Sequence, residues 1–160
     1  MKNCLCKIAG LALFMLCFSA RAQTVGIYKT EDLLRRIYNN SDTTYIVNFW
    51  ATWCKPCVAE LPEFETFHHT YKHKAVKVLL VSMDFREDME KRLLPFLKKN
   101  NYASEVVLLD EINGNDFIDK ISKEWSGAIP ATLVTSKNKS KQLFFEKKLN
   151  FILLEEALNK

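Results

Sequence analysis

Glycine and proline are scarce in this chain, which has four of each among its 160 residues. That scarcity excludes collagen-like chains and low-complexity chains rich in Pro and Gly. Hydrophobic residues make up 48% of the sequence and charged residues 26%, so the composition is that of a globular protein and not of a disordered one. The length matches the range of about 100–200 residues for one domain. Because no Pro/Gly-rich linker divides the chain, we expect a single folded core.

Apolar runs long enough to span a bilayer are also missing. Residues 8–18 are uncharged and mostly apolar, but eleven residues fall well short of the roughly 20 that a membrane-spanning helix needs. A short basic start precedes this run, and residues 20–22 supply small side chains at the two positions that a signal peptidase reads. We therefore expect residues 1–22 to be a signal peptide cleaved near Ala22, and residues 23–160 to be an exported domain in the periplasm or another extracytoplasmic compartment. Lipidation at Cys17 is disfavoured by the bulky residues before it.

Little net positive charge and few cysteines remain once this signal is removed. Lys and Arg fall from 23 to 20 against 19 Asp and Glu, so the basic excess belongs mainly to the signal. Nucleic-acid binding would require a basic stripe that survives processing, and we predict no nucleic-acid partner. Three of the five cysteines leave with the signal. The domain keeps only Cys54 and Cys57.

The rest of the chain alternates between two kinds of hydrophobic pattern. Runs of β-branched, aromatic and aliphatic residues predict buried strands, and apolar residues three or four apart predict helices. In chain order we expect a helix capped by Thr30 and ending near 39–40, a strand at 45–50, a helix at 57–71 bent or divided at Pro62, a strand at 76–81, a helix at 87–98, a strand at 106–109, a helix at 116–125, paired strands at 131–135 and 143–145 across a polar turn at 136–140, and a closing helix capped by Asn150. This order indicates an α/β fold with helices on both faces of one sheet.

The two remaining cysteines lie where a buried strand gives way to a helix. In the segment Trp53-Cys54-Lys55-Pro56-Cys57, the first sulfur meets the unpaired amides of the helix N-terminus. That end and the neighbouring lysine favour a thiolate, which is the nucleophilic form, so Cys54 is the expected attacking residue. Cys57 lies one turn further in, where it can resolve a mixed disulfide. Trp53, beside Cys54, is a candidate substrate contact.

A second feature lies much further along the chain. Ile129 and Pro130 directly precede the apolar strand that begins at Ala131. Proline at the start of a strand, close to Gly127, is a common place for a constrained and sometimes cis peptide bond.

Together, the segments NFWATWCKPCVAELPEFE (48–65) and WSGAIPATLV (125–134) resemble the TlpA/ResA branch of thioredoxin-like proteins. The resemblance implies a thioredoxin-like fold with a central mixed sheet, and an extra helix and strand inserted at 87–109. It also implies that Pro130 is cis and faces the disulfide, that the backbone of Ile129 binds substrate, and that Glu60 lies near the thiols. Thioredoxin itself has a buried aspartate where this chain has Asn48, which makes Glu60 the expected proton carrier.

The same resemblance implies a function without a metal or organic cofactor. Members of this branch are extracytoplasmic thiol-disulfide oxidoreductases, which suggests a reductase acting on oxidised protein substrates and supplied with electrons by a membrane-bound donor. The sequence names neither the substrate nor the donor.

Three alternatives use the same residues differently. The spacing of Cys54, Cys57, His69 and His73 approaches that of a zinc finger, but along one helix His69 would lie about 18 Å beyond Cys57. A copper carrier would prefer a wider cysteine spacing and a nearby histidine. A peroxidase of the same fold would need a PxxxTxxC pattern, and the proline of that pattern is missing here.

Overall fold

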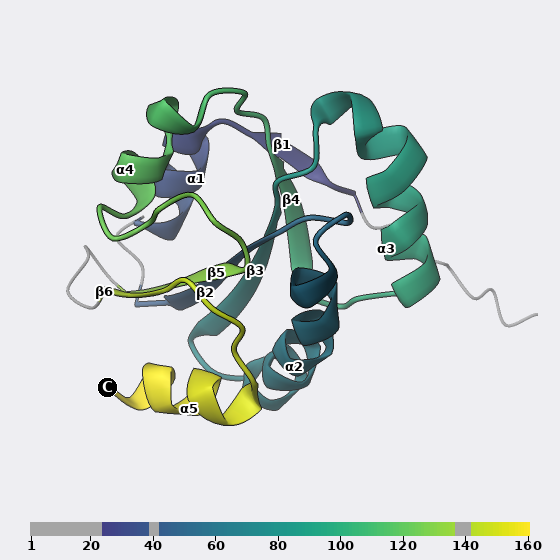
Figure 1. Cartoon of the computed structure of the whole chain (residues 1–160). Coiled ribbons are helices and arrows are strands. Elements are labelled where there is room, and N and C mark those ends of the chain that lie inside the picture. The colour runs from purple at the N-terminus through teal and green to yellow at the C-terminus, as the bar shows by residue number, and fades with distance from the viewer. Residues whose placement is uncertain (1–23, 39–41, 137–141) are drawn as a thin grey trace, which may run out of the picture.

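The computed structural model describes residues 24–38, 42–136 and 142–160, and in these residues a six-stranded mixed sheet forms the centre of the fold (Figure 1). The strand order is β1-β4-β3-β2-β5-β6. The first four strands in this order are parallel, and β5 and β6 are antiparallel to their neighbours, which confirms the mixed sheet expected from the sequence. The strands are β1 Gly26–Tyr28, β2 Thr44–Trp50, β3 Val76–Ser82, β4 Glu105–Leu109, β5 Ala131–Thr135 and β6 Gln142–Phe145.

Helices cover both faces of this sheet. In Figure 1, α1 and α4 lie on one side of the strands, and α2, α3 and α5 lie on the other. None of the helices in the described parts of the chain is long and apolar enough to cross a membrane. The helices are α1 Thr30–Ile37, α2 Lys55–Tyr71, α3 Leu94–Asn100, α4 Ile118–Ile121 and α5 Phe151–Asn159, with short 3-10 turns η1 Arg86–Asp88 and η3 Gly114–Asp116 and a π-helical turn η2 Met89–Leu93.

The central strand β2 is buried on both faces. Ile46 and Trp50 pack into the apolar layer under α2, α3 and α5, whereas Val47 and Phe49 pack into the layer under α1 and α4. All four side chains are fully buried. Because successive strand residues point to opposite faces, a continuous apolar run fills both layers, as the sequence predicted.

The sheet register brings the two sequence motifs together. Phe49 near the end of β2 pairs with Ala131 at the start of β5. The chain leaves β2 toward the cysteines at the same end of the sheet at which it enters β5 from Pro130. Phe49 and Ala131, which are 82 positions apart in sequence, are therefore neighbours in the sheet.

Several elements differ from the sequence expectations near the N-terminus. The edge strand β1 was not expected; it pairs with β4, Gly26 opposite Val107. Lys29, and not Thr30, is the N-cap residue of α1, since its backbone N–H bonds to Asp32. Thr30 is instead fully buried, and its hydroxyl donates a 2.8 Å hydrogen bond to Glu111.

Two predicted helices are also different in the structure. The helix expected at 116–125 is reduced to α4, because the chain leaves helical geometry at Ser122, whose φ and ψ are extended. The helix expected at 87–98 begins as a 3-10 turn and a π-helical turn before α3. The helix from Cys57 is one unbroken α2 that contains Pro62, and Asn150 caps α5 as expected. The signal peptide expected at 1–22 and most of the turn expected at 136–140 lie outside the described residues.

Candidate redox site

The two cysteines form a disulfide at the N-terminus of α2. Their sulfur atoms are 1.99 Å apart, and Cys54 is the N-cap residue of the helix. The backbone N–H of Cys57 points at Sγ of Cys54, with 3.3 Å between nitrogen and sulfur. Pro56 occupies the first turn, where its missing N–H leaves no helical hydrogen bond unmade. A negative charge forming on the Cys54 sulfur would therefore meet a backbone donor and the positive end of the helix.

The two sulfurs differ in access. Cys54 is 6% exposed, whereas Cys57 is fully buried. The residue before the pair, Trp53, is 52% exposed, in contrast to the fully buried Trp50 and Phe49. An approaching molecule can therefore reach Cys54 and Trp53, but not Cys57.

A second loop faces Cys54, the more accessible of the two cysteines. The Ile129–Pro130 peptide bond is cis, as the sequence resemblance implied. The carbonyl oxygen of Ile129 lies 3.8 Å from Sγ of Cys54. The structure thus brings Ile129 and Pro130 to the cysteines from a distant part of the chain.

Glu60 is fully buried on α2, one turn beyond Cys57. Its Oε1 accepts a 2.8 Å hydrogen bond from the side-chain amide of Asn48, and its Oε2 accepts a 2.7 Å bond from the backbone N–H of Leu149. Burial disfavours the charged carboxylate and raises the pKa of Glu60, although both hydrogen bonds and the charge of Lys148 act in the opposite direction. Glu60 is therefore not the exposed helix residue that its sequence position alone would allow.

Asn48 connects this carboxyl group to the strand that follows Pro130. Its Nδ2 lies 3.2 Å from Oγ1 of Thr132, which is directly opposite Asn48 in the sheet register. Asn48 and Thr132 are both fully buried. A chain of polar contacts therefore runs from Glu60 to β5, two residues after Pro130.

Sequence reasoning missed the residue that holds the loop before Cys54. Asp84, which follows β3, is 2% exposed. Its carboxylate accepts hydrogen bonds from the backbone N–H of Thr52 at 3.1 Å and from the Thr52 hydroxyl at 2.6 Å. The hydroxyl of Ser82 donates a further bond of 2.8 Å. The sequence signal was an acidic residue two positions after a buried strand, because the ends of parallel strands meet at one end of the sheet.

Metal ligands do not gather in the part of the chain that the structure describes. No group of three or more His, Cys, Asp or Glu side chains there could hold an ion. Helix α2 runs without a break to Tyr71, so His69 lies about 18 Å along the helix from Cys57. Ligands of one zinc ion all lie about 2.0–2.3 Å from the metal.

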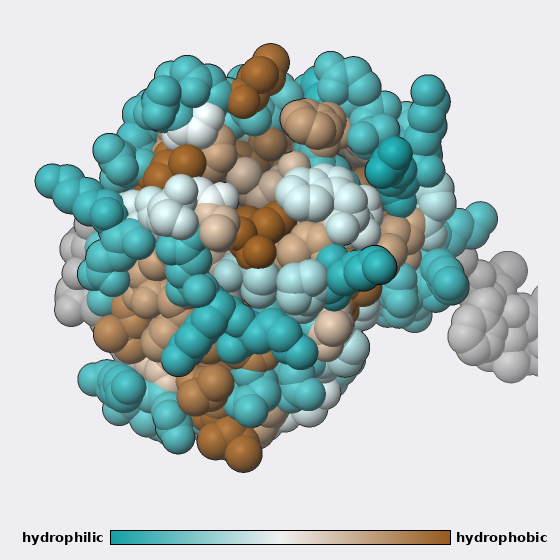
Figure 2. All heavy atoms as spheres, viewed as in Figure 1, coloured by the Kyte–Doolittle hydropathy of each residue, from teal (hydrophilic) through white to brown (hydrophobic). Residues whose placement is uncertain are grey.

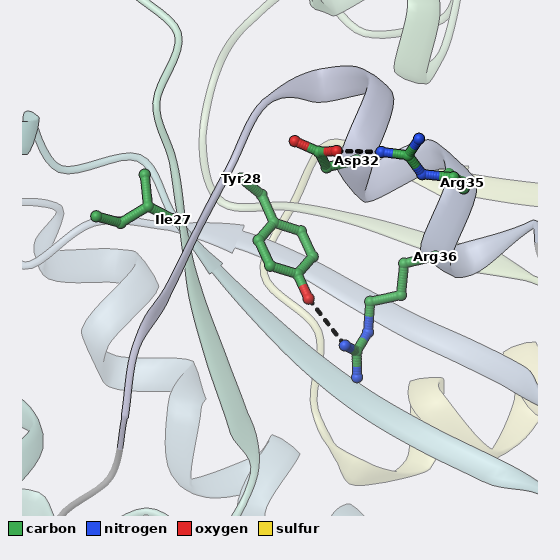
Figure 3. A pocket seen from close by; sticks show the side chains of 5 residues that line it. All are labelled: Ile27, Tyr28, Asp32, Arg35 and Arg36. Atoms are coloured by element: carbon green, nitrogen blue, oxygen red, sulfur yellow. Dashed lines mark hydrogen bonds and ion pairs between the residues drawn. The ribbon is translucent and has the colours of Figure 1, made fainter.

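An open hollow lies away from the cysteines, between β1 and α1 (Figure 3). Two of its lining side chains, Tyr28 and Arg36, join across it through a 2.9 Å hydrogen bond. Asp32 and Arg35 on the same helix form an ion pair. The charges that line this hollow therefore already have partners within the chain.

Comparison with known proteins places this geometry in a family. The model of the AhpC/TSA family matches residues 17–140, which is most of the chain, so the protein belongs to that family. Sporulation thiol-disulfide oxidoreductase A from Bacillus subtilis is 32% identical over 69 residues, which cover 43% of this chain and 42% of that protein. Thiol-disulfide oxidoreductase ResA from Oceanobacillus iheyensis is 48% identical over 42 residues, covering 26% and 22% of the two chains. The chain thus matches less than half the length of these curated relatives.

Solved structures confirm the thioredoxin-like fold. A thioredoxin-related protein from Neisseria meningitidis serogroup B superimposes with a TM-score of 0.63 and 22% identity, over 76% of this chain and 86% of that one. A secreted disulfide oxidoreductase from Mycobacterium tuberculosis superimposes with a TM-score of 0.54 and 18% identity, over 75% and 83% of the two chains. The relatives named here thus include thiol-disulfide oxidoreductases, and one of the two structures is of a secreted protein.

Proposed function

We propose that this protein is an extracytoplasmic thiol:disulfide oxidoreductase that reduces disulfide bonds in other proteins. The observation that carries the proposal is the Cys54–Cys57 disulfide at the start of α2, in which Cys54 is 6% exposed and Cys57 is fully buried. A thiolate is the attacking form of cysteine in disulfide exchange. The helix N-terminus and the N–H of Cys57 favour that form at Cys54.

The proposed reaction has two exchange steps and needs no metal or organic cofactor. In the reduced protein, the Cys54 thiolate attacks one sulfur of the substrate disulfide; that S–S bond breaks, and the other substrate sulfur leaves as a thiolate. Cys57 then loses its proton and attacks Sγ of Cys54. The mixed disulfide breaks, the second substrate thiolate leaves, and the Cys54–Cys57 disulfide forms. Two electrons have then passed from the protein to the substrate.

Three further residues have roles in this scheme. Glu60 takes the proton that Cys57 must lose: it is buried on α2 one turn beyond Cys57, and burial raises the pKa of its carboxyl group, which makes it a better proton acceptor. The backbone of Ile129, which faces Cys54, binds the substrate segment as a short extended strand. Trp53 is half exposed beside Cys54 and contacts apolar substrate groups.

The proposed compartment and the proposed direction of electron flow rest on different evidence. The sequence pattern at 1–22 supports export, and a protein of similar fold from Mycobacterium tuberculosis is described as secreted. In an oxidising compartment the cysteine pair stays oxidised unless a donor reduces it. Reduction of substrates therefore requires a donor that returns electrons to the cysteine pair, and a membrane-bound protein would have this role.

The peroxidase and metal alternatives gain no support from the site. A peroxidase needs a threonine hydroxyl that activates the reacting sulfur, and the hydroxyl of Thr52 donates to Asp84 instead. The metal alternatives need free thiolates and further ligands near Cys54. The two sulfurs are bonded to each other.

The reduction potential of the purified exported domain tests the direction. We expect a value closer to that of thioredoxin, about −270 mV, than to that of a strong oxidant such as DsbA, about −120 mV. Equilibration with mixtures of oxidised and reduced dithiothreitol, followed by thiol trapping, gives the value. Reduction of insulin disulfides by wild type, and loss of that activity in Cys54→Ser, would support the activity. A potential near −120 mV would contradict the reductive direction.

A further inference from the structure

One carboxylate fastens the loop that faces Cys54. Glu146, the residue after β6, accepts hydrogen bonds from the backbone N–H groups of Ser126 at 3.1 Å and Ala128 at 2.9 Å. The hydroxyl of Ser126 donates a third hydrogen bond to the same carboxylate. Three donors from the loop before Pro130 therefore converge on the two carboxylate oxygens of the residue that follows β6.

The loop is held from its other side by a buried aromatic residue. Nε1 of Trp125 donates a 2.8 Å hydrogen bond to the carbonyl oxygen of Ala128. The Trp125 ring is 4% exposed, and its centroid lies 4.7 Å from that of Phe49 on β2. Both backbone polar groups of Ala128 are thus fixed, its N–H by Glu146 and its carbonyl by Trp125.

Ala128 directly precedes Ile129, whose carbonyl oxygen lies 3.8 Å from Sγ of Cys54. Ser126, Gly127 and Ala128 are themselves exposed to solvent. Exposed backbone of this kind moves readily unless hydrogen bonds restrain it. The position of Ile129 relative to the reactive sulfur therefore depends on how firmly Glu146 holds Ala128.

We propose that Glu146 is a positioning residue for disulfide exchange: its carboxylate holds the loop 126–128 so that the backbone of Ile129 is already in place when an extended segment of an oxidised protein binds beside Cys54. This inference rests on the proposed function and adds a residue to it. A loop that is ordered before binding lowers the entropic cost of association. Loss of the restraint should therefore weaken substrate binding more than it slows reaction of the sulfurs.

The chemistry of the site requires a carboxylate. All three groups that face Glu146 are donors, and an ionised carboxylate is a pure acceptor. These hydrogen bonds, that of the Ser126 hydroxyl first, lower the pKa of Glu146, so the ionised form is present at neutral pH. In Glu146→Gln one oxygen becomes an NH2 group, which in either orientation would face a backbone N–H, that of Ser126 or that of Ala128. The substitution keeps the size of the side chain but no longer offers an acceptor to every donor of the loop.

The test compares Glu146→Gln with two other variants. Ser126→Ala removes only the hydroxyl donor. Glu156→Gln makes the same charge change at an exposed position of α5 and serves as the matched control. For each variant, kcat and KM are measured with insulin as the disulfide substrate, and the rate at which dithiothreitol reduces Cys54–Cys57 is measured separately. A small dithiol reaches the sulfur without forming a strand along Ile129.

We expect Glu146→Gln to raise KM for insulin about three- to tenfold, as loss of preorganised binding predicts. The dithiothreitol rate should stay within about twofold of wild type, Ser126→Ala should show a smaller rise in KM, and Glu156→Gln should match wild type. Amide hydrogen exchange should become faster at Ala128 in Glu146→Gln and stay unchanged in β3, which shows that the fold is intact.

Two outcomes would overturn the proposal while the wild type remains active. One is an unchanged KM in Glu146→Gln, and the other is an equal loss of rate with insulin and with dithiothreitol, which would indicate general structural damage. Unchanged exchange at Ala128 would overturn it whether or not the protein reduces disulfides. A wild type that does not act on protein disulfides would instead contradict the proposed function.

Discussion

The side-chain amide of Asn48 donates a 2.8 Å hydrogen bond to the carboxyl group of Glu60, and both side chains are fully buried between β2 and α2. The second oxygen of Glu60 accepts from the backbone of Leu149, just before α5. One carboxyl group therefore joins the central strand, the helix of the cysteines and the closing segment of the chain. Its protonation should influence both the stability of the fold and the reactivity of the thiols.

Glu60→Gln should change how stability depends on pH. Burial raises the pKa of Glu60 in the folded protein above its ordinary value of 4.5. The folded state then binds this proton more tightly than the unfolded state, so the associated stability is present below the ordinary value and is lost as pH rises through the folded pKa. Urea denaturation at a series of pH values gives the free energy of unfolding of both proteins. As pH rises, Glu60→Gln should become more stable relative to wild type.

The exposed Glu156→Gln again provides the control, and its difference from wild type should stay nearly constant over the same pH range. A constant difference for Glu60→Gln as well would mean that Glu60 titrates normally.

The same substitution should alter the thiols of the reduced protein. A buried carboxylate one turn beyond Cys57 disfavours a second negative charge nearby, so we expect the two groups to titrate as a coupled pair once the disulfide is reduced. Glu60→Gln should lower the apparent pKa of the thiols and slow resolution of the mixed disulfide by about a hundredfold, a typical contribution of a proton carrier. The measurements are the pH dependence of thiol alkylation and the stopped-flow rate of resolution. Superimposable alkylation profiles with equal rates would remove Glu60 from the mechanism.

Asp84→Asn should destabilise the loop that leads to Cys54. The buried carboxylate accepts from the backbone and hydroxyl of Thr52 and from Ser82, and all of these groups donate. An amide NH2 in place of one oxygen leaves buried donors unpaired, at a cost of about 1–3 kcal/mol in the free energy of unfolding. Urea denaturation measures this cost. Asp119→Asn on the exposed side of α4 should change stability by less than about 0.5 kcal/mol, and an equally small effect at Asp84 would contradict the account.

Gly127 should resist substitution because of its backbone conformation. Its φ is +96°, a region that residues with a Cβ rarely adopt. A Cβ at Gly127 would lie 2.9 Å from Cδ1 of Ile118, and a Cβ at Gly114 would lie 2.8 Å from the same atom, but only Gly127 has positive φ. Gly127→Ala should therefore lower the free energy of unfolding by about 1–2 kcal/mol more than Gly114→Ala. Equal effects would assign the cost to the shared contact with Ile118.

The parts of this fold that the sequence could predict are those in which local pattern and burial agree. The continuous apolar runs at β2 and β3 could be interpreted directly, because both faces of these strands are covered. The cysteine motif also predicted the start of α2, because the features that favour a helix N-terminus lie within a few neighbouring residues. The edge strand β1 has only three residues, and it exists because β4 offers it a partner.

The residues that hold the site were harder to predict, because their role depends on contacts between distant segments. Asp84 is 32 positions from Thr52, and Glu146 is 18 positions from Ala128. A single acidic residue in a sequence gives no sign of which backbone amides it will meet. The apolar spacing at 116–125 predicts a helix that includes Trp125, whereas in the structure Trp125 lies in the loop after α4, where its indole N–H bonds to Ala128.

The measurement that tests the central claim most directly is the trapping of a mixed disulfide with single-cysteine variants. The claim is that Cys54 attacks and Cys57 resolves, because Cys54 is the more accessible of the two and Cys57 is fully buried. Reduced Cys57→Ser, mixed with insulin, should accumulate a mixed disulfide that survives acid quenching and is released by dithiothreitol; mass spectrometry should locate it at Cys54. Cys54→Ser should form little or none. Adducts that accumulate only in Cys54→Ser would contradict the account and reverse the roles of the two sulfurs.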